Sequence, residues 1–137
     1  MIERYKRPDR KNAMSILEAA KGEMNYTLSL DVKESAGPTI VRNIYEAFRM
    51  LGDAILVSKG IISQDHLLPL QELSKLKIST PRPINLIETL RILRHNVNYY
   101  GYKPKLTEVE DVIDFAKSVF NEASEEVRKQ IESKQNA

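Results

Sequence analysis

Four polar side chains are spaced along residues 91–98 so that a helix would bring them together. Arg91 and His95 are four residues apart, as are Arg94 and Asn98, and the two arginines are three apart. Helical residues at these spacings are neighbours, so two guanidiniums, an imidazole and an amide would share an arc of roughly 100°, with no carboxylate on the same stripe. Arginine binds phosphate oxygens in pairs, and histidine donates or accepts a proton near neutral pH. The cluster therefore suits a phosphate-bearing ligand, and it contains the parts needed for metal-independent RNA cleavage.

A structural role for the same cations competes with this reading. Arg91 and Arg94 could pair with acids on a neighbouring helix, with Glu46 and Asp53 as candidates. Cations in the last turns of a helix are also stabilised by the helix dipole. In that case the chain would be a non-catalytic protein-interaction bundle.

Three tyrosines follow the cluster and divide in the same way. Tyr99 and Tyr102 flank Gly101 and could stack on a base, or could pack with their hydroxyls in water. Tyr100 falls on the apolar side of the predicted helix and is expected in the core, together with Leu86, Leu90, Leu93 and Val97.

Other chemistries lack their residues. There is no cysteine, and the two histidines, His66 and His95, are far apart, so we expect no metal site. His66 is interpreted as a first-turn residue of a helix. No phosphate-cradling glycine loop, nucleophile elbow or dinucleotide fingerprint is present, and no cofactor is expected.

The composition favours one globular domain over residues 1–137. Hydrophobic residues make up 42% and charged residues 29% of the 137 positions, which is typical of soluble domains. No apolar run is long enough to span a bilayer, and the first residues are too polar for a signal peptide. We therefore expect a cytoplasmic protein without a membrane partner.

The net charge of +2 is small, but the charges are unevenly distributed. Residues 77–105 carry six basic side chains and Glu88 as the only acid, whereas the chain from Thr107 onward is acidic. A basic middle segment indicates either an anion-binding surface or solvated helix faces.

Five helices are needed to position these residues, and no strand-like alternation persists. Their predicted ranges are 10–30, 38–60, 64–76 (or from Pro69), 83–100 with Gly101 as the cap, and 107–131 with a capping box at Thr107. Apolar residues cover more than one face of the second helix, so that helix is either central or also packs on a second subunit. Short loops between the helices favour an all-α, up-and-down antiparallel bundle.

The order of elements, together with two segments, resembles the HEPN superfamily of small helical nucleotide-binding domains. The segments are Lys59-Gly60 followed by Asp65-His66-Leu67-Leu68, and an Arg-polar-x-x-x-Tyr motif at Arg94 to Tyr99, ahead of an acidic last helix. The resemblance covers most of the chain. It implies a homodimer that binds RNA or a nucleotide, and in some members a minimal nucleotidyltransferase antitoxin as partner.

Many members of that superfamily are metal-independent RNases, often toxins of toxin–antitoxin pairs, with four to six residues between the motif arginine and a histidine. Here Tyr99 stands in that position, and tyrosine, with an unperturbed pKa of about 10, is a poor base at neutral pH. The resemblance therefore implies a binding module without strong catalysis, with Arg91, Arg94, His95, Asn98, Tyr99 and Tyr102 as ligand-binding residues. If the chain is an RNase, Arg94, His95 and Tyr99 would be its catalytic residues.

Overall fold

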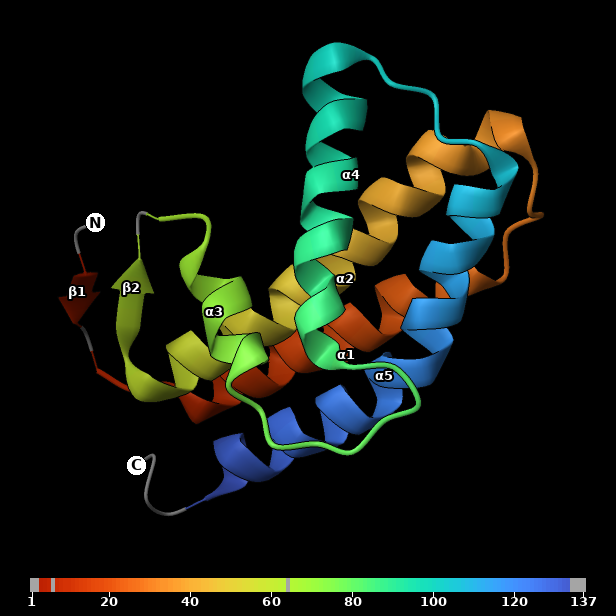
Figure 1. The fold of residues 1–137 in the computed structure, drawn as a ribbon. Helices are drawn as coiled ribbons and strands as arrows, with labels where there is room; N and C mark the ends of the chain where they lie inside the picture. The colour runs from red at the N-terminus through yellow and green to blue at the C-terminus, as the bar shows by residue number, and fades with distance from the viewer. Residues whose placement is uncertain (1–2, 6, 64, 134–137) are drawn as a thin grey trace.

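The computed structural model describes residues 3–5, 7–63 and 65–133 (Figure 1). It confirms an all-α bundle of five helices. These are α1 (Arg10–Leu28), α2 (Gly37–Lys59), α3 (Leu68–Ser74), α4 (Ile87–Tyr100) and α5 (Leu106–Glu132). Single 3-10 turns, Glu34–Ala36 and Ile84–Leu86, lead into α2 and α4.

Helix α2 is the central element. It contacts α1, α3, α4 and α5, and its buried side chains include Phe48, whose ring packs against those of Phe115 and Phe120 from α5. Of the two explanations for its wide apolar surface, the central position is confirmed, because this single chain covers more than one of its faces.

Hydrogen bonds between distant residues set the directions of the long helices. The amide of Asp9, the N-cap of α1, donates to the carbonyl of Val57 near the end of α2 at 3.1 Å, so α1 and α2 are antiparallel. Arg10 at the start of α1 donates from Nε to the carbonyl of Ile131 at 3.0 Å and from Nη2 to that of Glu132 at 2.6 Å. Its guanidinium therefore satisfies the last carbonyls of α5 and makes α5 antiparallel to α1.

Two short strands, β1 (Glu3–Tyr5) and β2 (Ile61–Ser63), form an antiparallel pair that the sequence pattern did not predict. Arg4 lies opposite Ile62. Three residues are too few for a period of two to be recognised, and the partners lie at opposite ends of the α1–α2 pair in sequence. The pair extends the bundle beside the end of α2 (Figure 1).

Helix α3 lies against α2 with almost no space between the two backbones. It begins one residue before Pro69, so the later of its two predicted starts is confirmed; Gln64, the earlier one, lies outside the described residues. A Cβ atom at Gly52 of α2 would be 2.1 Å from the carbonyl oxygen of Pro69. Only glycine therefore permits this approach.

A buried carboxylate, Glu72 of α3, is held by two lysines. Its oxygens lie 3.2 Å from Nζ of Lys59 and 2.8 Å from Nζ of Lys75. Burial raises the pKa of Glu72, but the two lysines together outweigh that effect and leave its pKa below the ordinary value.

The ends of α4 and α5 show one prediction confirmed and one wrong. Gly101 ends α4 in the left-handed conformation, with φ of 64°, as predicted. Helix α5 does not begin with a Thr107 cap, because Lys105 is its N-cap and the Glu108 side chain accepts from the Lys105 amide at 2.9 Å. The capping box therefore lies two residues earlier than the motif predicted, with Glu108 as its acid.

Within the described residues, no helix combines the length and apolar character needed to cross a membrane.

Candidate functional site

The predicted cluster lies where α4 runs beside α2. Nε of Arg42 on α2 donates to Oδ1 of Asn98 on α4 at 2.8 Å, and the guanidinium of Arg94 lies 4.9 Å from the ring centre of Tyr45. Residue numbers fall along α4 as they rise along α2, so the two helices are antiparallel here. Side chains of both helices therefore build one surface.

Arg94 is the member of the cluster that is anchored without a counter-charge. In the part of the chain that the structure describes, no carboxylate forms an ion pair with it. Tyr45 beneath it is 4% exposed, and a cation over a buried aromatic ring is an attractive contact. Burial raises the pKa of Tyr45, although the positive charges of Arg94, Arg49 and Arg91 oppose that rise.

Arg91 differs from Arg94 because it is neutralised on its own helix. Its Nε lies 3.0 Å from both carboxylate oxygens of Glu88, three residues earlier. The expectation that no carboxylate shares the stripe was therefore wrong. This hydrogen bond holds the pKa of Glu88 below its ordinary value.

The predicted pairing of Arg91 and Arg94 with acids on a neighbouring helix was wrong. Glu46 and Asp53 do not pair with Arg91 or Arg94, since both carboxylates are taken by Arg49 of the same helix, with Arg49 Nε 3.2 Å from Glu46 Oε2. Burial raises the pKa of Asp53, while the charge of Arg49 lowers it. A partner three or four residues away on one helix needs no tertiary docking, which explains the preference.

His95 and the tyrosines face outward from the bundle. The ring of His95 lies 4.7 Å from that of Tyr99 and 5.7 Å from that of Tyr100. Tyr99 is 67% exposed and Tyr100 is 76% exposed. The prediction that Tyr100 belongs to the core was wrong: Val97 is buried, but the last turn of α4 extends beyond the helices that would cover it (Figure 1).

Tyr102 does not join this surface. Its hydroxyl donates to the Glu108 carboxylate, which raises the pKa of Tyr102. The carboxylate also accepts from the Lys105 amide at the start of α5, so the hydroxyl of Tyr102 is tied to α5. Of the predicted ligand residues, Arg94, His95, Asn98 and Tyr99 remain available together.

Arg42 is a member of the site that the sequence did not indicate. It is exposed, and within the described ranges it forms no ion pair with a carboxylate. The available signal was a charged residue three positions before Tyr45 in a helix dominated by apolar residues. We refer to Arg42, Arg94, His95, Asn98 and Tyr99 as the cationic surface.

The cationic surface offers hydrogen-bond donors and exposed rings. Two arginines can each bind phosphate oxygens, the Asn98 amide can donate, and Tyr99 presents a face for stacking. His66 lies apart, exposed in the turn before α3. No group of three or more metal-ligating side chains occurs among the described residues.

Comparison of the chain with protein-family models, with curated proteins and with solved structures gives no match.

Proposed function

We propose that this chain is a HEPN-like helical module that binds RNA or a nucleotide through the cationic surface, without strong catalysis. The observation that supports this most directly is the pairing of Arg42 and Arg94. They come from two different helices, flank one surface, and have no carboxylate partner in the described part of the chain. The other cations of α2 and α4 at this surface, Arg49 and Arg91, are neutralised by nearby acids.

The way Arg94 is held suits an anionic ligand. Its contact with Tyr45 is a cation–π contact, which engages the charge without using carboxylate acceptors for its N–H donors. The N–H groups of Arg94 can therefore donate hydrogen bonds to phosphate oxygens. A base adjacent to the phosphate could stack on Tyr99, the exposed aromatic ring that lies against His95.

The arrangement of Arg94 and His95 supports the proposal of weak or absent catalysis. Consecutive helical residues point roughly 100° apart, so the two side chains leave α4 in different directions. Arg94 contacts α2, whereas His95 contacts the outward rings of Tyr99 and Tyr100. One protomer therefore does not aim the cation and the imidazole at the same phosphate.

Fluorescence anisotropy with a labelled single-stranded RNA and with labelled ATP, measured over a salt series, tests the proposal. Arg42→Ala and Arg94→Ala should each weaken binding about tenfold. Each should also reduce the slope of log affinity against log salt by roughly 0.7, the loss of one phosphate contact on a single strand. Arg128→Ala is the matched control, because that arginine is paired with Glu125 and Glu132 on α5. Unchanged binding by both variants would refute the proposal.

The ribonuclease alternative is tested on the same samples. Cleavage that persists in chelator and is lost in His95→Ala would replace the binding module with an RNase of a toxin–antitoxin pair. The partner would then be a minimal nucleotidyltransferase antitoxin, as the resemblance implies.

Homodimerisation is part of the proposal and is now supported by α4. Helix α2 does not support homodimerisation, because other helices of the same chain cover its apolar faces. On α4, Ile92, Tyr99 and Tyr100 are each at least half exposed, and exposed apolar side chains gathered on one element are typical of interaction surfaces. Sedimentation equilibrium of the wild type and of Ile92→Glu measures the oligomeric state. A wild-type dimer that the substitution dissociates is expected, and a wild-type monomer at high concentration would exclude homodimerisation.

A further inference from the structure

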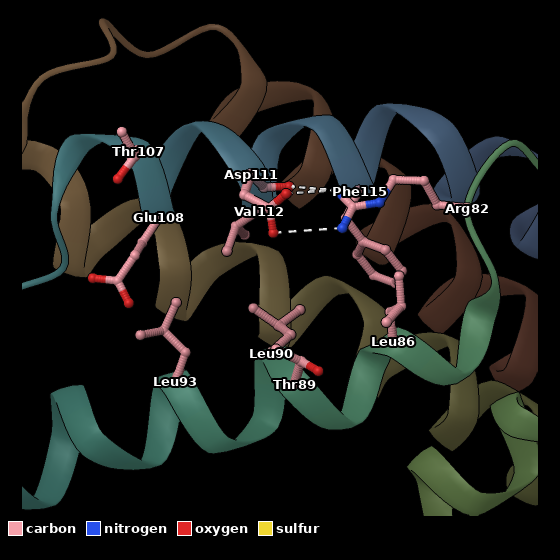
Figure 2. Close-up of a pocket in the computed structure, with 10 residues that line it drawn as sticks. All are labelled: Arg82, Leu86, Thr89, Leu90, Leu93, Thr107, Glu108, Asp111, Val112 and Phe115. Carbon is pink, nitrogen blue, oxygen red and sulfur yellow. Dashed lines mark hydrogen bonds and ion pairs between the residues drawn. The ribbon is translucent and has the colours of Figure 1, made fainter.

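A separate cavity lies on the other side of α4, between α4 and α5. Its volume is about 330 Å3 (Figure 2). Its walls are largely apolar. Leu86, in the 3-10 turn before α4, and Leu90 and Leu93 of α4 face Val112 and Phe115 of α5. Small-molecule sites are concave and mostly apolar, and this volume is at the lower end of their range.

One end of the cavity is closed by an arginine whose charge is more than balanced. Nη1 of Arg82 lies 2.9 Å from Oδ1 of Asp111, 3.1 Å from the Asp111 carbonyl and 3.3 Å from Oδ2 of Asp114. The same guanidinium is 5.9 Å from the centre of the Phe115 ring. Two carboxylates against one cation leave one negative charge in excess, so this end does not attract an anion.

The opposite end carries a carboxylate without a cationic partner. Oε1 of Glu108 accepts from the Lys105 amide and from the Tyr102 hydroxyl. Neither Lys103 nor Lys105 forms an ion pair with it in the described ranges. Figure 2 shows this carboxylate projecting toward α4 beside Leu93, at the edge of the apolar walls.

We propose that the α4–α5 cavity binds a small organic cation: an ammonium group attached to an aromatic or aliphatic body. The ammonium group pairs with Glu108, and the body lies along the α4 leucines toward Phe115. Apolar walls reduce the local dielectric constant and so strengthen an ion pair at the mouth of the cavity. The excess negative charge at Arg82 disfavours a ligand that carries a carboxylate. None of the residues of the cationic surface lines this cavity, so the proposal does not depend on nucleotide binding.

Three probes with one shared body test the charge requirement: phenylbutylammonium, phenylbutanol and phenylbutanoate. Titrations followed by amide NMR shifts should place the ammonium probe at α4 and α5, with at least tenfold tighter binding than the alcohol and weaker binding still for the carboxylate. Absence of ammonium binding at millimolar concentration, shifts confined to other elements, or equal binding of the carboxylate would overturn the proposal.

Two variants separate the role of the carboxylate from that of the walls. Glu108→Gln retains an oxygen that accepts from the Lys105 amide, so α5 stays capped, and it should abolish the preference for ammonium over alcohol. Thr89→Trp places a ring at an exposed position on the cavity wall and should weaken all three probes. Arg94→Ala should bind the probes like the wild type, which distinguishes this site from the RNA-binding surface. A Glu108→Gln protein that keeps the ammonium preference would also refute the assignment.

Discussion

The close approach of α3 to α2 makes Gly52→Ala the sharpest test of this structure. A Cβ atom at position 52 would lie 2.1 Å from the carbonyl oxygen, 2.5 Å from the carbonyl carbon and 2.8 Å from Cα of Pro69. Ordinary van der Waals contact begins at 3.4 Å, so the first of these atoms is more than 1 Å too close. All three belong to the backbone, and no rotation of a side chain can relieve the clash.

The size of the effect follows from two opposing contributions. Alanine favours a helix over glycine by about 1 kcal/mol. Overpacking costs about 1–3 kcal/mol and more where the neighbours cannot move, and α3 is fixed by Leu73, which has no exposed surface. We expect a net loss of about 2 kcal/mol in the free energy of unfolding, and for a domain of this size a fall in Tm of roughly 6–10 °C.

Gly22→Ala is a matched control for the same chemical change. Gly22 lies in the interior of α1, and nothing is within 4 Å of the Cβ it would carry. That variant should gain about 0.5–1 kcal/mol. Urea unfolding followed by circular dichroism measures both variants, and a Gly52→Ala protein as stable as Gly22→Ala would refute the α2–α3 packing.

Four further substitutions test individual side chains by the same unfolding measurement. Arg10→Ala should lose about 1 kcal/mol, because its guanidinium satisfies the last carbonyls of α5; an unchanged stability would contradict that contact. Glu72→Gln should remove part of the acid sensitivity: the lowered pKa of Glu72 gives a stabilisation present above about pH 4.5 that is lost as pH falls through the folded pKa. A variant that keeps the wild-type pH dependence from pH 5 to 3 would refute the two-lysine clamp. Val97→Ala should cost about 2 kcal/mol whereas Tyr100→Ala should change stability by less than about 0.5 kcal/mol, since the first side chain is buried and the second is exposed; the reverse order would restore Tyr100 to the core.

The helices of this bundle could be predicted because their signals are local. Apolar spacing located α1, α2 and α5, and glycines marked the ends of α2 and α4 at Gly60 and Gly101, both left-handed. These features depend on residues within one or two turns of each other. They can therefore be predicted from the sequence alone.

The wrong predictions concern which helix covers a given turn and which charged side chain lies nearest to an arginine. A helical projection placed Tyr100 among the apolar residues, but an angle around the axis does not say whether another helix reaches that turn. The sequence pattern offered acids on a neighbouring helix as partners of Arg91, but Glu88 on its own helix forms the ion pair. Placing Arg42 beside Asn98 needed the register of α2 against α4, which no local pattern encodes.

The contact between Arg10 and the end of α5 also has a consequence for the order in which the chain folds. Its two hydrogen bonds join residues that are 121 and 122 positions apart in sequence. The α1–α2 hairpin can form from neighbouring segments while synthesis continues, because closing its short loop costs little entropy. The final turn of α5 depends on a distant residue instead, since its carbonyl acceptors are satisfied by a side chain that is synthesised 121 positions earlier. A ribosome-stalled chain that stops before residue 131 should therefore hold a protease-resistant hairpin but an unfinished bundle.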